Sequence, residues 1–193
     1  FDGLSFLVSP GEHVALTGPS GCGKTTVLRC LLGFSEPAAG EIVVQGEALS
    51  PHSVWNIRSQ LAFVPQEAEL GEGTVREFID RPFQYRANSA VPDYGERLPL
   101  LFDAVGLDTA LLSSSITSLS GGEKQRIALV SALLLDRPIL LLDEVTSALD
   151  KENRARVNAL LSGLSDTTVV GVVHEGAGMP FATRQIAVVG GRA

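Results

Sequence analysis

VALTGPSGCGKTTVLRCLL, residues 14–32, is the stretch that decides the fold. Its apolar start, Val14–Thr17, predicts a short strand, and Lys24–Leu32 predicts the helix that follows and ends near Gly33. Between the two, residues 18–25 match the pattern G-x-x-x-x-G-K-[ST], which forms a phosphate-binding loop when it follows a strand and opens a helix. The stretch therefore predicts a strand–loop–helix unit that binds a nucleotide.

The composition of this loop suits contact with phosphate. Glycines let backbone N–H groups turn inward toward phosphate oxygens, and the helix N-terminus adds the positive end of its dipole. Lys24 is expected to reach the β- and γ-phosphates, and the Thr25 hydroxyl to ligate Mg²⁺. The alternative is a chance glycine-rich turn, but at glycine's average share of ~7% a random match in such a chain is roughly a one-percent event.

Strand-like and helix-like segments alternate along the rest of the chain, which indicates an α/β fold with a mixed, mainly parallel sheet. Pro138–Leu142 lacks any alternation of apolar and polar residues, as expected for a strand covered on both faces. The other expected strands are Glu41–Val44, Leu61–Val64, Thr167–Val173 and Gln185–Val189. We expect the last two to be a central and a peripheral strand of the same sheet.

Residues 67–119 have a different pattern, because their apolar residues are spaced as in helices and are interrupted by prolines. Two segments fit capping boxes, Thr74 with Glu77 and Ser120 with Glu123, and the second leads into a helix expected from about Gly122 to Leu135. We therefore predict one domain over residues 1–193, in which residues 67–135 form a helical subdomain inserted into the sheet core.

Composition excludes several other classes of protein. The 193 residues are 45% hydrophobic and 19% charged, which favours a packed core over disorder. The net charge of −7 argues against a general nucleic-acid binder. No apolar run approaches the ~18 residues of a membrane-spanning helix. The only two cysteines, Cys22 and Cys30, give no disulfide framework and favour a reduced, cytosolic setting, and Trp55 is expected to pack in the protein.

The run ILLLDE at residues 139–144 is an apolar strand that ends in two carboxylates. Two solvated acids at a strand end would be the plain interpretation. Beside a phosphate loop, the pattern favours Asp143 as the Walker-B aspartate that holds Mg²⁺, directly or through water. Glu144 is then placed to polarise an attacking water as a general base.

The run LSGGEKQR, residues 119–126, contains more glycine than a well-capped helix start needs. Two glycines in the first turn of a helix lower its stability by about 1 kcal/mol each relative to alanine. This loss has a reason if a second phosphate group must approach the backbone there closely. With the preceding motifs, this run resembles the signature motif of the ATP-binding subunits of ABC transporters, and the resemblance covers essentially the whole chain. It implies the ABC ATPase fold, a P-loop NTPase core with an inserted helical subdomain.

The resemblance also implies a role for each motif. Gln66 resembles the Q-loop glutamine, which touches Mg²⁺ and senses the membrane partner, and Asp150 ends a D-loop that crosses a dimer interface. His174 resembles the switch histidine that contacts the γ-phosphate and, with Glu144, handles the water. The expected nucleotide-binding residues are Gly18, Pro19, Ser20, Gly21, Cys22, Gly23, Lys24, Thr25, Thr26, Gln66 and Asp150, with Ser120, Gly121 and Gly122 supplied by the opposite subunit. The expected Mg²⁺ ligands are Thr25, Gln66 and Asp143.

From this resemblance we expect a transport-coupled ATPase that uses ATP and Mg²⁺ and forms a head-to-tail homodimer around the nucleotide. Its partner would be an integral-membrane permease, and the chain itself would lie peripherally on the cytoplasmic side of the cell membrane. No nucleic-acid partner is expected. Among subgroups, the small bacterial FetA-type cassettes implicated in iron export are the most similar, on LSGGEKQR, LLLDEVTSALD at residues 140–150 and RPFQYRAN at residues 81–88. The family's adenine-stacking aromatic residue would precede Phe1.

Two alternatives remain open at this point. A soluble ABC ATPase of DNA-repair or translation type would share these motifs, although such proteins carry long coiled-coil insertions or two fused cassettes. A non-catalytic, nucleotide-gated interaction module is the other, and the presence of Glu144 argues against it. Co-purification with a multi-span membrane protein would test the first alternative, and a phosphate-release assay the second.

Overall fold

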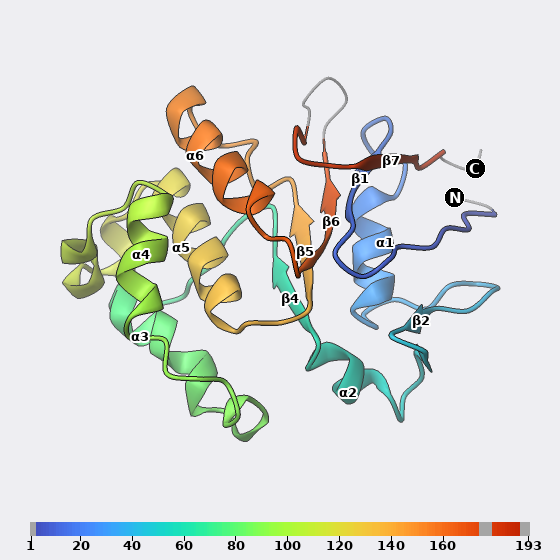
Figure 1. The fold of residues 1–193 in the computed structure, drawn as a ribbon, viewed down its shortest axis with the longest axis horizontal. Coiled ribbons are helices and arrows are strands. Elements are labelled where there is room, and N and C mark those ends of the chain that lie inside the picture. Colours follow the sequence, from blue (N-terminus) through green and yellow to red (C-terminus); the bar gives the residue numbers. More distant parts are fainter. Residues whose placement is uncertain (1–2, 174–178, 190–193) are drawn as a thin grey trace. The chain divides into compact units, whose positions relative to one another are not determined.

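The computed structural model describes residues 3–173 and 179–189 and divides into two compact units (Figure 1). The sheet unit contains, among the described residues, 3–63, 137–144, 166–173 and 179–189. The helical unit contains residues 64–136 and 145–165, so the expected subdomain 67–135 lies within it and is joined there by a later segment.

A five-stranded sheet forms the centre of the sheet unit, in the order β4-β5-β6-β1-β7. The central strand β6 is parallel to both β1 and β5, and β7 is parallel to β1. The strands are β1 (His13–Thr17), β4 (Leu61–Val64), β5 (Ile139–Asp143), β6 (Thr168–Val172) and β7 (Arg184–Ala187). The predicted mainly parallel α/β fold is confirmed, and so are the interior position of β6 and the edge position of β7.

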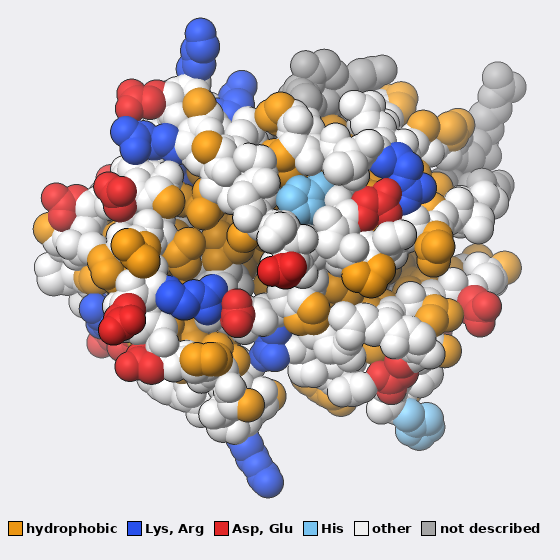
Figure 2. All heavy atoms as spheres, viewed as in Figure 1, with side chains coloured by type: hydrophobic (Ala, Val, Ile, Leu, Met, Phe, Trp, Pro, Cys, Tyr) orange, Lys and Arg blue, Asp and Glu red, His pale blue; other side chains and the backbone are white. Residues whose placement is uncertain are grey.

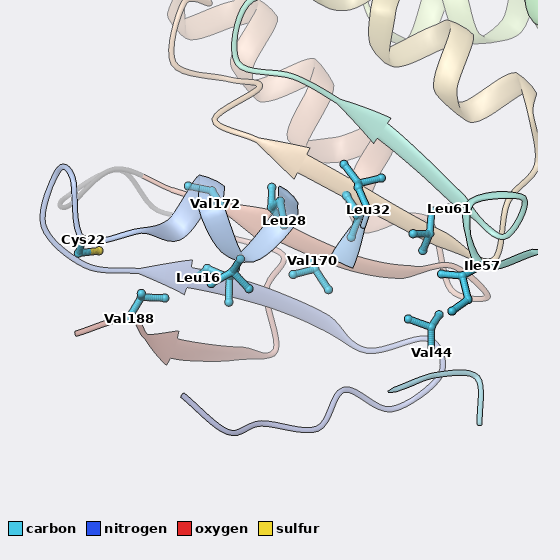
Figure 3. Packing of buried hydrophobic residues seen from close by; sticks show 12 residues of the cluster. Leu16, Cys22, Leu28, Leu32, Val44, Ile57, Leu61, Val170, Val172 and Val188 are labelled. Atoms are coloured by element: carbon cyan, nitrogen blue, oxygen red, sulfur yellow. The ribbon is translucent and has the colours of Figure 1, made fainter. Parts of the chain in front are cut away.

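Helix α1 (Lys24–Leu31) packs on this sheet through the apolar face that its sequence provides (Figure 3). Leu28 of the helix lies in one buried cluster with Leu16 of β1 and with Val170 and Val172 of β6. Burying an apolar side chain of this size stabilises the fold by roughly 1.5–3 kcal/mol. The packing therefore fixes the position of the loop that joins β1 to α1.

The expected strand Glu41–Val44 is largely absent. Only β2 (Val43–Val44) forms, and it pairs with β3 (Glu47–Ala48) in a two-residue antiparallel ribbon. The turn residues Gln45 and Gly46 both have positive φ, which matches the twist of a tight hairpin. The hairpin therefore ends the strand early.

The expectation that Trp55 packs in the protein is wrong. It lies on the short helix α2 (Val54–Arg58) and is 74% exposed. The Arg58 guanidinium covers one face of its ring at 5.1 Å from the centroid and also covers Phe34 at 4.5 Å. The Trp55 indole thus lies outside the core, where a cation–π contact with Arg58 holds it.

Four α-helices form most of the helical unit: α3 (Val75–Asp80), α4 (Arg97–Ala104), α5 (Gly121–Leu134) and α6 (Lys151–Ser162). Both predicted capping boxes are present, at the starts of α3 and α5. Between α3 and α5 the chain also forms four 3-10 turns: Arg81–Gln84, Arg86–Asn88, Thr109–Ser113 and Ile116–Ser118. None of the helices within the described residues is long and apolar enough to cross a membrane.

Candidate functional site

The loop between β1 and α1 folds around the ammonium group of Lys24. Lys24 is only 6% exposed, and its Nζ donates hydrogen bonds to the carbonyl oxygens of Gly18 at 2.8 Å and Pro19 at 3.0 Å. Gly23, with φ of 102°, caps the helix, and no acidic side chain lies in the first turn of α1. A positive charge and free helical N–H groups therefore meet at this loop, as an anion site requires.

Gly18 is required by its surroundings. Its φ is 145°, and a Cβ at this position would lie far inside contact distance of the Val188 carbonyl oxygen. Cys22, further along the same loop, has its side chain in the apolar cluster that contains Leu16 and Val188 (Figure 3). Cys22 therefore presents only its backbone to any ligand in the loop.

Asp143, at the end of β5, meets the start of α1. The Thr25 hydroxyl donates to Asp143 Oδ1 at 3.1 Å, and Asp143 is only 3% exposed. Burial raises the pKa of Asp143, while the Thr25 hydrogen bond and the Lys24 charge act in the opposite direction. A hydroxyl and a carboxylate that converge at a phosphate loop are the oxygen donors that Mg²⁺ prefers.

Two protein oxygens are few for a resident metal centre. The described residues contain no group of three or more His, Cys, Asp or Glu side chains that could hold a metal ion. Mg²⁺ usually keeps several waters and binds through one or two protein oxygens plus substrate phosphates. The pair Thr25 and Asp143 fits that pattern.

Glu144 follows Asp143 and has a left-handed backbone, with φ of 51°. Its N–H donates to the Val172 carbonyl oxygen at 3.2 Å, which ties this turn to the end of β6. The N–H of Val173 in turn donates to Leu16 O at 3.1 Å. The C-terminal ends of three strands therefore meet at the phosphate loop. His174 itself lies outside the described residues.

The predicted site residues outside the β1–α1 loop and the β5–β6 strand ends belong to the helical unit. Gln66 is exposed just after β4, and the side chain of Gln125 on α5 donates to the carbonyl oxygen of Pro65 at 2.7 Å. The structure thus brings Thr25 and Asp143 together at the loop, and it places Gln66, Ser120 and Asp150 in the other unit.

Ser120 caps α5 at an exposed turn. Its Oγ accepts from the Glu123 N–H at 3.3 Å, and Glu123 Oε2 accepts from the Ser120 N–H at 2.8 Å. The Ser120 hydroxyl also donates to Glu123 Oε2 at 2.7 Å, and this bond, with the one from the Ser120 N–H, lowers the pKa of Glu123. Gly121 is exposed, and a Cβ there would meet nothing within 4 Å. The turn is thus rigidly capped and open to another molecule.

Asp150 caps α6 in the same way. Its Oδ1 accepts from the Asn153 N–H at 2.9 Å, its Oδ2 accepts from Asn153 Nδ2 at 2.6 Å, and these bonds lower its pKa. Both carboxylate oxygens are thus engaged within the chain. Sequence reasoning did not single out Asn153, or Arg126, which contacts it. The sequence feature that could have identified Arg126 is its position as a cation within the apolar helix that follows residue 122.

Comparison with known proteins agrees with this geometry. A family model described as ABC transporter matches residues 1–147. The chain is 41% identical over 184 residues to "ABC-type transporter MDR1" of Aureobasidium melanogenum, covering 89% of this chain and 13% of that protein. It is 38% identical over 201 residues to the "ATP-dependent lipid A-core flippase" of Burkholderia pseudomallei, covering 99% and 33%. The chain thus spans a third or less of the length of these relatives.

Solved structures are similar over nearly the whole chain. The dimeric post-hydrolysis state of the ATP-binding cassette MJ0796 bound to ADP and Pi has a TM-score of 0.82 at 30% identity, and covers 95% of this chain and 84% of that one. A bacterial Atm1-family ABC exporter with ATP bound has a TM-score of 0.79 at 30% identity, covering 96% and 33%.

Proposed function

The chain belongs to the ABC transporter family and has the α/β fold of its ATPase cassettes, and we propose that it binds MgATP and hydrolyses it to drive a membrane transporter. The observation that supports this most is the cluster at the β1–α1 loop. There the Lys24 ammonium, the Thr25 hydroxyl and the Asp143 carboxylate converge.

Each residue of the cluster has a separate task in this mechanism. The loop amides and Lys24 hold the phosphates and neutralise their charge, which is most of what phosphoryl transfer asks of a protein. Thr25 and Asp143, with Gln66, would hold Mg²⁺, which when bound withdraws charge from the β- and γ-phosphate oxygens. Glu144 accepts the proton of the attacking water, and His174 contacts the γ-phosphate.

The proposed active form is a head-to-tail homodimer that encloses two ATP molecules. The exposed, capped turn at Ser120, Gly121 and Gly122 supports this, because it offers N–H groups to a phosphate. The phosphate loop of the same chain lies in the sheet unit, so we propose that this turn serves the nucleotide of a second chain. Asp150 would lie at the same interface. The cassette MJ0796 is described as dimeric, which supports the proposal by similarity.

The partner would be an integral-membrane permease, contacted from the cytoplasmic side through the region of Gln66. Residues 67–135 would be the inserted helical subdomain of a single domain. What the transporter moves is set by the membrane part. The proposal of iron export receives no support from the two relatives above, since the name of one reads only ABC-type transporter MDR1 and that of the other refers to a lipid A-core flippase.

The surface gives a soluble, nucleic-acid-directed ATPase little support. On the face drawn in Figure 2, the described Lys and Arg side chains lie among Asp and Glu side chains rather than in a continuous basic area. A nucleic-acid footprint would be a basic patch or stripe. We therefore favour a transporter, without a nucleic-acid partner.

A phosphate-release assay on the purified chain tests the proposed function. Turnover with MgATP should rise more steeply than in proportion to protein concentration, because each site needs two chains. Glu144→Gln should abolish turnover while ATP still binds. Binding without turnover at any concentration would favour a nucleotide-gated module, and full turnover by Glu144→Gln would exclude Glu144 as the base.

A further inference from the structure

Arg126 is a buried cation near the start of α5, and it is 8% exposed. Its Nε donates to the Gly122 carbonyl oxygen at 3.2 Å, and its Nη1 donates to the carbonyl oxygens of Val105 at 3.0 Å and Gly106 at 3.2 Å. Nη1 also donates to Asn153 Oδ1. Burial lowers the pKa of Arg126. Burying a guanidinium is expensive, so these four acceptors must hold it in one geometry.

Asn153 transmits that geometry to the start of α6. Its amide oxygen accepts from Arg126, while its Nδ2 donates to Asp150 Oδ2 at 2.6 Å. Only one orientation of the amide satisfies both partners, because Arg126 has only donors and the ionised Asp150 only acceptors. A continuous chain of hydrogen bonds therefore runs from Gly122 through Arg126 and Asn153 to Asp150.

Two further contacts hold the loop before α6, residues 146–150. Arg154 donates through Nε to the Thr146 carbonyl oxygen at 3.2 Å and through Nη2 to the Leu149 carbonyl oxygen at 2.9 Å. A Cβ at Gly122 would lie 3.5 Å from Leu149 Cδ2, so the first turn of α5 packs directly on this loop. Packing and hydrogen bonds thus connect the same two segments.

We propose that Arg126 and Asn153 are positioning residues that join the Ser120–Gly122 turn and the 146–150 loop into one rigid element. The proposal rests on the proposed function, in which the Ser120–Gly122 turn meets the nucleotide held by a second copy of this chain and Asp150 lies at the same interface. A rigid element presents both segments with a single placement and lowers the ordering cost of association. Arg126 and Asn153 therefore set the affinity of the ATP-bound dimer without touching ATP.

This role separates two measurable affinities. The phosphate loop belongs to the sheet unit, whereas the whole Arg126–Asn153–Asp150 chain belongs to the helical unit. Loss of the connection should leave ATP binding to a single chain unchanged and weaken only ATP-driven dimerisation. A residue that merely stabilises the fold would weaken both together.

The test uses Glu144→Gln as the parent, so that ATP is retained. Asn153→Ala removes the amide and keeps Arg126. Arg126→Lys keeps the charge, but one ammonium cannot reach the acceptors that a planar guanidinium serves. The matched control is Arg156→Ala, one turn further along α6, which removes an exposed ion pair with Glu152 and a like charge near Arg126, but no hydrogen bond of the Arg126–Asn153–Asp150 chain. Sedimentation measures the dimer dissociation constant with MgATP, and a fluorescent ATP analogue measures binding to dilute monomer.

Asn153→Ala and Arg126→Lys should raise the dimer dissociation constant at least about tenfold, with monomer affinity for the analogue within twofold of the parent; Arg156→Ala should change neither. A dimer dissociation constant within twofold of the parent for Asn153→Ala would overturn the inference alone. A parallel loss of monomer affinity would also overturn it, since the residue would then only stabilise the fold. A parent that never dimerises with MgATP would refute the proposed function, and the inference with it.

Discussion

Lys24→Ala separates the role of Lys24 in binding from any role in folding. The Nζ group is buried and bonded to the carbonyl oxygens of Gly18 and Pro19 rather than to a carboxylate. Two hydrogen bonds to a charged donor contribute roughly 1.5–3 kcal/mol each, and the desolvation of the ammonium offsets much of this gain. The free energy of unfolding should therefore change by no more than about 1 kcal/mol.

The effect of Lys24→Ala on ATP binding should be larger. A unit charge at about 4 Å from a phosphate oxygen contributes up to about 4 kcal/mol at an effective dielectric constant near 20. Counterions and Mg²⁺ reduce that value, so a loss of at least ~1.4 kcal/mol, or tenfold in affinity, is expected. Arg29→Ala is the matched control, because it removes the same charge from an exposed position in the last turn of α1.

Calorimetric titration with MgATP measures the affinity, and urea unfolding measures the stability. The expected result is a loss of tenfold or more for Lys24→Ala, less than twofold for Arg29→Ala, and little change in unfolding for either. Unchanged ATP affinity in Lys24→Ala would show that this loop does not hold the phosphates. A large loss of stability would show that Lys24 is mainly a structural residue.

Three further predictions follow from particular contacts. Gly18→Ala should destabilise the chain by more than the cost of a left-handed residue, about 1–2 kcal/mol, because its Cβ would overlap the Val188 carbonyl oxygen. Gly21→Ala, whose Cβ would lie in open space, should cost only about that amount. Urea unfolding of both variants measures the two losses, and equal losses would contradict the overlap. Glu144→Gln should form a dimer with MgATP, seen by gel filtration, at a concentration where the wild type is monomeric, and a monomer with wild-type turnover would contradict it. Hydrogen bonds from Ser120 lower the pKa of Glu123 in the folded state, so its contribution to stability is complete above the unfolded pKa of about 4.3 and is lost as the pH falls through the folded value; Glu123→Gln should make the fall in unfolding free energy below that pH shallower, and an identical pH profile would contradict the assignment.

Where the local signal was strong, the sequence predicted the structure well. Strand β4 is Leu61–Val64, as expected, and β5 and β6 begin and end within one residue of their predicted bounds, because uninterrupted apolar runs identify buried strands. Both capping boxes form, since Ser or Thr followed by Glu three residues later satisfies the first turn through local hydrogen bonds alone.

What the sequence did not predict depends on contacts between distant residues. Helical spacing in residues 67–119 yields several 3-10 turns, because prolines and short segments prevent longer helices. Arg126 and Asn153 lie far apart in the sequence, so only the packing of α5 against α6 shows that they meet. The side chain of Cys22 lies in the core although its loop consists mostly of small and polar residues.

The backbone of Glu144 gives evidence for its role that does not depend on the motif. Three non-glycine residues among those described have positive φ: Gln45, Asp136 and Glu144. The first lies in the tight turn between β2 and β3, and the second follows the end of α5, where a left-handed residue is common. Neither a tight turn of this kind nor a helix end explains the positive φ of Glu144, since Glu144 follows a strand and its N–H donates to the Val172 carbonyl oxygen. Such a conformation costs 1–2 kcal/mol, and Gly or Asn would relieve it. A glutamate retained at that cost, next to the Asp143 and Thr25 pair, is better explained by the chemistry of its carboxylate than by the needs of the fold.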